Sequence, residues 1–234
     1  MDEKERHSRT AMLIGDSGVG RLKNSGVAVF GLGGVGGMAC EALARAGVGR
    51  FLLVDADTVS ESNINRQVIA TYDTVGRYKT DVMEERILSV NPSAQIVKKQ
   101  LFYDSSTADE ISLEGYDCVL DAIDSVPSKL LLIETAYRSA IGTVSCMGAG
   151  NKLDPTRFEA ADIYETSVCP LARVMRSQLR KRGVSSLRVI YSKEEPVRPR
   201  EGGSVPGSAP WCAPAAGLAA AGEVIKILLR EENK

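Results

Sequence analysis

Several polar residues in this chain are of the types that enzymes use to bind a nucleotide polyphosphate. Asn63, Arg66 and Gln67 lie close together, and Lys79 follows after a short interval. Arginine and lysine neutralise phosphate oxygens, and amide side chains can add hydrogen bonds to them. Asp124, further along the chain, offers a carboxylate for Mg²⁺. Cationic groups on a polyphosphate together with a magnesium ligand are what phosphoryl or nucleotidyl transfer from ATP requires.

A glycine-rich turn precedes these clusters. Gly31-x-Gly33-x-x-Gly36 follows the apolar run 27–30 and comes before a stretch of small residues, and Gly34 adds a fourth glycine. Glycine lets the backbone approach a phosphate closely, and the start of a helix supplies free N–H groups and a favourable dipole. The pattern therefore predicts a nucleotide-binding turn formed by these four glycines.

An acidic pair after the next apolar run extends this nucleotide signature. Asp55 lies 24 residues beyond Gly31, where a carboxylate can bind the ribose hydroxyls, and Asp57 is a further candidate contact. NAD-dependent hydride transfer is the usual function of such a signature, but the nicotinamide then carries the chemistry. A dehydrogenase would have little use for Arg66 and Lys79. The cluster therefore favours ATP over NAD.

Alternating strand-like and helix-like segments would bring these residues to one edge of a sheet. Strands are expected over 27–30, 51–54, 95–99, 117–120, 142–147 and 187–191, and helices over 34–46, 79–90, 129–139, 171–182 and 215–229. The alternation predicts an α/β, Rossmann-like fold with a mostly parallel sheet and helices on both faces. Ligands bind at the carboxyl ends of such strands. This placement favours a site over two simpler interpretations, in which Arg66 and Lys79 are solvated charges and Asp124 caps a helix.

The composition is that of a globular protein with a sizeable core. Hydrophobic residues make up 44% and charged residues 25% of 234 positions. We expect one domain over 1–234, in which the loop-rich stretch 151–214 is an elaboration that faces the substrate. No apolar run is long enough to span a membrane, and the charged start has no apolar signal core. We therefore expect a cytoplasmic protein that does not contact a membrane.

The five cysteines are scattered, without a Cys-x-x-Cys pair. This spacing argues against both a disulfide framework and a zinc site. Cys169 differs from the others because it precedes Pro170 and an expected basic helix, where its pKa could be lowered. We nevertheless expect an inert thiol there, with a thioester or persulfide role as the alternative.

Positive charge is concentrated in one segment. The net charge of the chain is −1, but residues 170–200 contain nine basic residues and only two acidic ones. Such a segment is typical of a surface that contacts a polyanion through its phosphates. The simpler interpretation is a solvated helix face.

Several strings together resemble the ubiquitin-activating-enzyme-like superfamily, and most closely the tRNA threonylcarbamoyladenosine dehydratases. The strings shared with the superfamily are the glycine turn, Asp55-x-Asp57-x-Val59-x-x-Ser62-Asn63-x-Asn65-Arg66-Gln67, Gly76-x-x-Lys79 and Asp121-Ala122-Ile123-Asp124-Ser125. Those shared with the dehydratases are Gly148-Ala149-Gly150, Asp154-Pro155-Thr156 and Pro170-Leu171-Ala172. The resemblance runs from Arg6 to Leu229.

This resemblance implies roles for individual residues. The glycines would hold the ATP phosphates and Asp55 the ribose, Asn63, Arg66 and Lys79 would contact the phosphates, and Asp124 would hold Mg²⁺. Arg9 resembles an arginine that superfamily dimers donate across the subunit interface. Members are typically homodimers, and some bind an alkali cation, Na⁺ or K⁺, near the site.

The implied reaction is the ATP-dependent dehydration of N6-threonylcarbamoyladenosine beside the tRNA anticodon, through adenylation of the threonyl carboxylate. In that case the basic segment 170–200 would contact the tRNA. Two alternatives stay open. One is an adenylyltransferase that activates a sulfur-carrier protein, against which the missing zinc cysteines count. The other is a non-catalytic ATP-binding scaffold that docks a sulfur-transfer protein, against which Arg66, Lys79 and Asp124 count.

Overall fold

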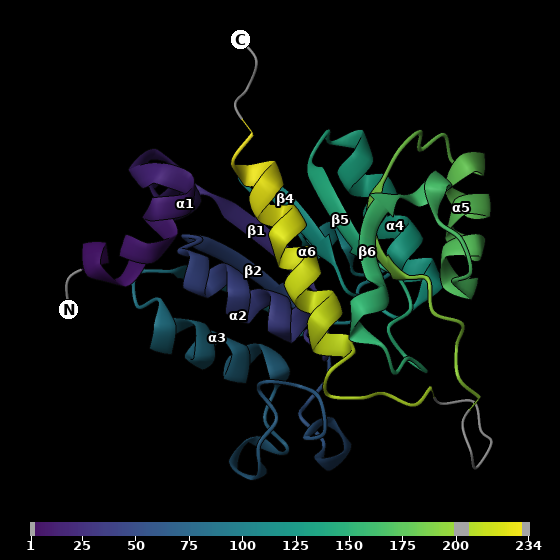
Figure 1. The fold of residues 1–234 in the computed structure, drawn as a ribbon, viewed down its shortest axis with the longest axis horizontal. Helices are drawn as coiled ribbons and strands as arrows, with labels where there is room; N and C mark the ends of the chain where they lie inside the picture. Colours follow the sequence, from purple (N-terminus) through teal and green to yellow (C-terminus); the bar gives the residue numbers. More distant parts are fainter. Residues whose placement is uncertain (1–2, 199–205, 231–234) are drawn as a thin grey trace.

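A seven-stranded sheet runs through the middle of the molecule (Figure 1). The computed structural model describes residues 3–198 and 206–230. The strands are β1 (Gly26–Phe30), β2 (Arg50–Val54), β3 (Gln95–Lys99), β4 (Cys118–Asp121), β5 (Gly142–Cys146), β6 (Phe158–Asp162) and β7 (Arg188–Ser192). Their order is β3-β2-β1-β4-β5-β7-β6, and every neighbouring pair is parallel except β6 with β7. The order reverses between β1 and β4, which is where ligands bind in open α/β sheets.

Helices cover both faces of this sheet. They are α1 (Glu3–Asn24), α2 (Gly36–Ala46), α3 (Lys79–Val90), α4 (Val126–Arg138), α5 (Pro170–Lys181) and α6 (Ala213–Leu228). α2, α3 and α6 pack on one face, where α6 lies across the strands (Figure 1). α4 packs on the other face, and α5 lies beside it at the β6–β7 edge. The predicted Rossmann-like architecture is confirmed.

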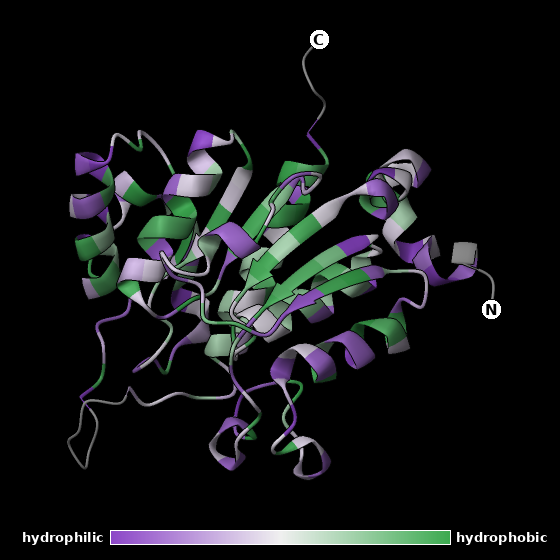
Figure 2. Ribbon diagram, turned by 180° about the vertical axis from the view of Figure 1, so that it is seen from behind, coloured by the Kyte–Doolittle hydropathy of each residue, from purple (hydrophilic) through white to green (hydrophobic). Residues whose placement is uncertain are grey.

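The central strands are apolar because both of their faces are buried. In β1, Val27 and Val29 face the core formed with α2 and α6, and Ala28 and Phe30 face the core formed with α4. All four are fully buried. A strand covered on both sides reads as a continuous apolar run rather than as an alternation, and in Figure 2 the strands in the middle of the sheet are largely in the apolar colour. No helix among the described residues is both long and apolar enough to span a bilayer.

Most expected elements are present, and α3 and β3 have the predicted bounds. The helix α4, predicted from Lys129, begins earlier at Val126, and β4 extends to Asp121. The stretch 151–214, predicted as loop-rich, also contains β6, which pairs antiparallel with β7. Residues 199–205 of this stretch lie outside the described residues, and α6 begins at Ala213.

The amino-terminal helix α1 has no counterpart among the predictions. Its mean hydropathy is low, and it is interrupted at Gly15, whose φ of 73° is not helical. The break destroys the apolar periodicity by which an amphipathic helix is recognised. A single apolar side chain from its second half, Leu22, is fully buried, which ties the helix to the core.

Candidate active site

The glycine turn between β1 and α2 is built by backbone contacts that leave no room for side chains. The Gly31 φ is 88°, a conformation that favours glycine, and its N–H donates to the Val54 carbonyl at 2.9 Å. A Cβ on Gly31 would lie 2.7 Å from the carbonyl oxygen of Ala122, which follows β4. A Cβ on Gly36 would lie 1.8 Å from the Gly31 carbonyl oxygen. These residues must be glycines for the turn to close on the ends of β1 and β4.

A cavity of about 490 Å³ opens at this turn, at the carboxyl ends of β1, β2 and β4. Nearly all the predicted nucleotide residues line it: Gly31, Gly33, Gly34, Asp55, Asp57, Asn63, Arg66, Gln67, Lys79 and Asp124. These residues come from four separate parts of the chain. The topology brings them together because the carboxyl ends of parallel strands meet at one edge of the sheet.

Asp55 is the buried acid of this cavity. One carboxylate oxygen accepts the Leu32 N–H at 2.6 Å, and the other accepts the Asp57 N–H at 2.8 Å. Burial raises the pKa of the Asp55 carboxyl above its ordinary value, although Lys79 and the two backbone donors oppose the shift. A carboxylate offers about four acceptor positions. Two therefore remain for a pair of ligand hydroxyls, such as those of a ribose.

Lys79 is the buried cation of the cavity. Its side chain is 7% exposed, and its Nζ lies 2.6 Å from Asp57 and 4.0 Å from Asp55. Asp57 is largely exposed, so this ion pair lies at the mouth of the cavity. An ammonium in this position can exchange a carboxylate partner for a phosphate oxygen when a nucleotide binds.

The predicted amide and guanidinium cluster surrounds the 3₁₀ turn η1 (Glu61–Asn63). Asn63 accepts the Ser60 N–H at 3.1 Å, and Arg66 donates to the Ser62 carbonyl at 3.0 Å and to Asn65 at 2.7 Å. The side-chain oxygen of Gln67 is buried and has no hydrogen-bond partner among the described residues. An unpaired buried amide oxygen is costly unless a ligand satisfies it.

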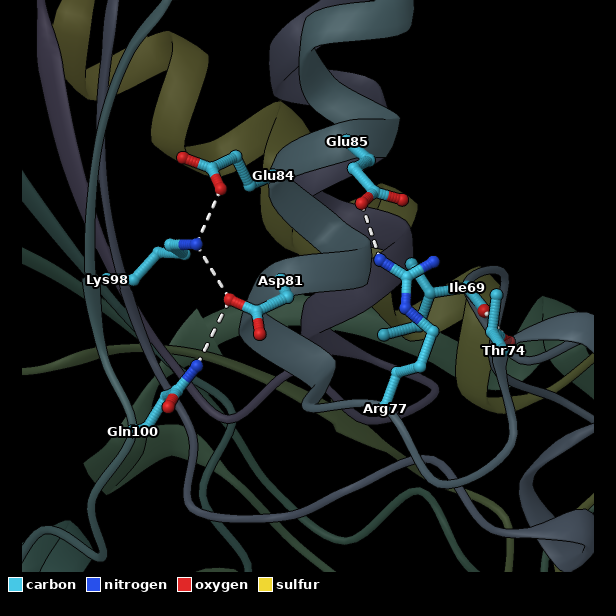
Figure 3. Close-up of polar contacts among 8 residues, drawn as sticks. All are labelled: Ile69, Thr74, Arg77, Asp81, Glu84, Glu85, Lys98 and Gln100. Carbon is cyan, nitrogen blue, oxygen red and sulfur yellow. Dashed lines mark hydrogen bonds and ion pairs between the residues drawn. The ribbon is translucent and has the colours of Figure 1, made fainter.

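A polar network holds the start of α3, and with it Lys79, against the end of β3 (Figure 3). Asp81 accepts from Lys98 at 2.7 Å and from Gln100 at 3.1 Å, and Lys98 also pairs with Glu84 at 2.6 Å. On the other side of α3, an exposed ion pair joins the preceding loop to the helix. The network also orients the chain after β3, whose residues Leu101, Phe102 and Tyr103 form one cavity wall.

Asp124 lies on the opposite wall and fits a role as a metal ligand. It is exposed, and it has no ion pair or hydrogen bond with another residue of the described chain. Within residues 3–198 and 206–230 no group of three His, Cys, Asp or Glu side chains could hold a metal ion. Mg²⁺ commonly binds through one or two carboxylates together with substrate phosphates. The single unpaired carboxylate beside the phosphate turn suits that arrangement.

Two predicted residues do not line the cavity. Gly36 begins α2 beneath the turn, and its role is to let the helix pack against Gly31. Arg9 is exposed on α1 and is not part of the cavity of its own chain. An arginine that is donated to a second subunit must be exposed in its own chain, so the prediction that Arg9 crosses the subunit interface stays open.

Some residues of the site were not predicted. Leu101 and Phe102 follow β3, in a stretch whose composition carries no ligand signal. Lys129 was expected only as the start of a helix, but it is fully buried and ion-paired. The sequence signal that could have indicated its burial is the position of a lysine in the first turn of an apolar helix. Cys169 is buried at the start of α5, so the expectation of an inert thiol stays open.

Fold and site together define a nucleotide-binding α/β protein that surrounds a glycine turn with cationic side chains and an exposed carboxylate. Comparison with known proteins gives the same class. The ThiF family model matches residues 7–234. The chain belongs to the ThiF family and, within it, to the tRNA threonylcarbamoyladenosine dehydratases.

The relatives that place it there are similar over most of their length. A tRNA threonylcarbamoyladenosine dehydratase of Bacillus subtilis is 46% identical over 195 residues, which are 83% of this chain and 77% of the relative. The Escherichia coli enzyme of the same name is 36% identical over 210 residues, 86% and 78% of the two chains. Crystal structures of the E. coli enzyme with AMP and with ATP superpose with TM-scores of 0.89 at 33% identity, covering 96% of this chain and 94% of that one.

The glycine contacts generate a prediction with a built-in control. We expect Gly36→Ala to destabilise the protein by roughly 3 kcal/mol or more, because its Cβ would overlap the Gly31 carbonyl. Gly222→Ala, in α6, meets nothing within 4 Å and should stabilise by about 0.5–1 kcal/mol. Urea unfolding of both variants measures the difference. Equal stabilities would contradict the close approach of α2 to the turn.

Proposed function

We propose that this protein uses ATP to dehydrate N6-threonylcarbamoyladenosine in tRNA. The observation that carries the proposal is the convergence of Arg66, Lys79 and Asp124 on the glycine turn within one cavity. An oxygen of the threonyl carboxylate attacks the α-phosphorus of ATP, and pyrophosphate leaves. The carbamoyl group then attacks the activated carbonyl and gives up a proton, and AMP leaves. The nucleoside thereby loses one water.

The side chains of the cavity supply charge and position rather than a nucleophile. Lys79 and Arg66 would neutralise the charge that develops on the phosphate oxygens, a contribution that is large in a site partly shielded from water. Asp55 would hold the ribose, and the glycine N–H groups would bind the phosphates. Asn63, Gln67 and Asp57 would add contacts at the edges of the nucleotide. Cys169 is not required by this sequence of steps.

Mg²⁺ is the metal that we infer for this site, with Asp124 as its protein ligand. When bound, the ion would polarise the phosphoryl oxygens and neutralise the leaving pyrophosphate. The resemblance to the superfamily, some members of which bind an alkali cation, also implies a Na⁺ or K⁺ site near the nucleotide, and this site is part of the proposal. Both ions need direct measurement.

We infer a homodimer in which Arg9 of one subunit reaches the cavity of the other. Arg9 is exposed on α1 and does not line the cavity of its own chain. Isologous dimers exchange identical contacts, so each site would receive one arginine. In that position the guanidinium would stabilise charge on the transferring phosphorus.

The exposed face of α5 is the tRNA contact that we propose. Arg176 of the basic segment donates to the backbone and side chain of Thr166, and Arg180 lies 5.2 Å from the Tyr164 ring centroid. These two residues hold α5 in place. Arg173 and Lys181 are exposed and make no such contact with the described chain. They are therefore better placed to bind phosphates, in a protein that we expect in the cytoplasm with its tRNA.

The alternative functions have less support. An adenylyltransferase and sulfurtransferase of Saccharomyces cerevisiae is 35% identical over 155 residues, only 35% of its length. The dehydratase relatives match more of this chain and more of their own length. A non-catalytic scaffold would not need the unpaired Asp124. A sulfur-transfer partner stays a hypothesis without a structural counterpart.

The proposed reaction can be measured directly. Incubation with ATP, Mg²⁺ and tRNA that carries threonylcarbamoyladenosine should yield a nucleoside lighter by one water, detected by mass spectrometry. Lys79→Met and Asp124→Asn should each lower kcat/KM by about 100-fold or more, because the first removes a cation at the phosphates and the second weakens the proposed Mg²⁺ ligand. Lys226→Gln, a distant exposed substitution on α6, is the control. An unchanged nucleoside with the parent protein would rule out the function.

The α5 surface can be tested by salt dependence. Arg173→Gln with Lys181→Gln should weaken tRNA binding. It should also reduce the magnitude of the slope of log K against log salt by roughly 1–2, because binding then neutralises fewer phosphates and releases fewer counterions. ATP affinity should not change. Lys226→Gln, also exposed but at the end of α6, should leave both quantities as they were. An unaltered slope in the double variant would place the tRNA elsewhere.

Donation of Arg9 between subunits has a complementation test. Arg9→Ala and Lys79→Met proteins should each be inactive alone. In a heterodimer, one site would combine an intact Lys79 with the Arg9 of the other subunit. Co-expressed in equal amounts, the two variants should recover about a quarter of the parent activity, since half of the dimers would contain one complete site. No recovery in a mixture shown to contain heterodimers would contradict the arrangement.

A further inference from the structure

A fully buried ion pair lies directly beneath the wall of the cavity that contains Asp124. Asp121, the last residue of β4, and Lys129, in the first turns of α4, both have side chains that are 0% exposed. The Lys129 Nζ is 2.9 Å from the Asp121 carboxylate. Neither residue lines the cavity, and the steps above use neither.

Every donor of the Lys129 ammonium has an acceptor. Besides Asp121, Nζ donates to the Ile123 carbonyl at 3.0 Å and to the Cys146 carbonyl, at the end of β5, at 2.8 Å. An ammonium has three N–H groups, so this set is complete. The side chain thus joins the carboxyl ends of β4 and β5 to the turn that follows β4.

Asp121 is satisfied in the same way. It accepts the Ser145 hydroxyl from β5 at 2.6 Å and the Ile123 N–H at 3.1 Å. Both the N–H and the carbonyl of Ile123 are therefore held by this pair of side chains. These hydrogen bonds hold the 121–124 turn on the side that faces away from the cavity.

The same turn forms two parts of the nucleotide site. The Ala122 N–H donates to the Phe30 carbonyl at 2.8 Å, and the Ala122 carbonyl packs closely against Gly31. Asp124 follows Ile123 and is exposed in the cavity. The position of Asp124 relative to the phosphate turn thus depends on the backbone that Lys129 and Asp121 hold.

Fold stability alone gives a weak reason for such a pair. Burying two charges carries a desolvation cost, and replacing a buried ion pair with neutral residues is often tolerated. A residue whose main effect was stability could therefore be apolar. Apolar side chains, however, could not hold both polar groups of Ile123 in one conformation.

We propose that Lys129, with Asp121, is a positioning residue that holds the 121–124 turn in the geometry that binds the nucleotide and its metal. The inference rests on two elements of the proposed function, ATP binding at the cavity and Asp124 as the Mg²⁺ ligand. Removing the pair should weaken ATP binding in the presence of Mg²⁺ more than in its absence, because the metal ligand Asp124 is the group displaced.

The test compares a variant without the pair with a control variant that is destabilised elsewhere in the same helix. Asp121→Asn with Lys129→Met removes both charges. The one asparagine oxygen can still accept the Ile123 N–H, whereas the Ile123 carbonyl loses the Lys129 donor. Leu132→Ala, on the same helix and fully buried in the core away from the turn, destabilises without touching the network. ATP dissociation constants are measured by calorimetry with Mg²⁺ and with EDTA, alongside urea unfolding.

We expect the double variant to lose at least about tenfold in ATP affinity with Mg²⁺ and less than about threefold with EDTA. Leu132→Ala should stay within about twofold in both conditions. Ser145→Ala, which removes one hydrogen bond to Asp121, should show the same Mg²⁺-selective loss at about two- to fivefold, and serves if the double variant does not fold. Equal losses with Mg²⁺ and EDTA, or no loss in a folded variant, would overturn the inference.

The experiment distinguishes failure of the positioning role from failure of the proposed function. If the parent protein binds ATP but does not dehydrate the tRNA nucleoside, the proposed function fails while the positioning role is still measured by binding. If the parent dehydrates the nucleoside and the double variant binds ATP normally, only the positioning role fails.

Discussion

The close approach of three backbone segments determines how the rest of this structure is arranged. The turn after β1, the first residue of α2 and the turn after β4 meet without intervening side chains, at distances that a Cβ on Gly31 or Gly36 would make impossible. This contact brings the amino end of α2 to the centre of the sheet edge. It also leaves a floor of exposed backbone on which a phosphate can lie.

The charged residues of the site are supported by separate networks, each anchored in a neighbouring part of the fold. Asp81, Lys98 and Glu84 hold α3 against β3, so Lys79 enters the cavity from one side. Lys129 and Asp121 hold the turn after β4, so Asp124 enters from the other. One network is partly exposed and the other fully buried. The nucleotide would bind between two walls that are stiffened independently, which is the preorganisation that charge stabilisation requires.

The stretch 206–214 contacts two separate parts of the chain. The Asn65 side chain, next to Arg66, donates to the Ser208 carbonyl at 3.0 Å, and Ala213 at the start of α6 packs against Gly34. Trp211 donates to the Leu153 carbonyl at 2.8 Å. The segment before α6 is thus linked both to the nucleotide cluster and to the chain after β5. The segment before α6 therefore contacts the nucleotide cluster at the edge of the cavity.

The sequence by itself determined the parallel strands with the helices between them, the glycine turn and the charged and amide residues of the cavity, but not α1 or β6. Apolar runs that end in glycine or in polar clusters are local signals, and a parallel sheet brings all such ends to one edge. Gly33, Arg66 and Asp124 could be assigned together for that reason. The role of Gly36 could not, because it depends on a backbone contact with Gly31 that no spacing reveals.

Only the tertiary structure decided which charges are buried and which are free. Lys129 and Asp124 are five residues apart, yet Lys129 is fully enclosed by the ends of β4 and β5, whereas Asp124 is exposed and has no partner among the described residues. Likewise, Arg176 is bound to Thr166 while Arg173 stays exposed on the same helix. Residue type sets what a side chain can bind. The packing of distant segments sets whether its charge is used within the protein or is available to a ligand, because burial and hydrogen-bond partners are not encoded locally.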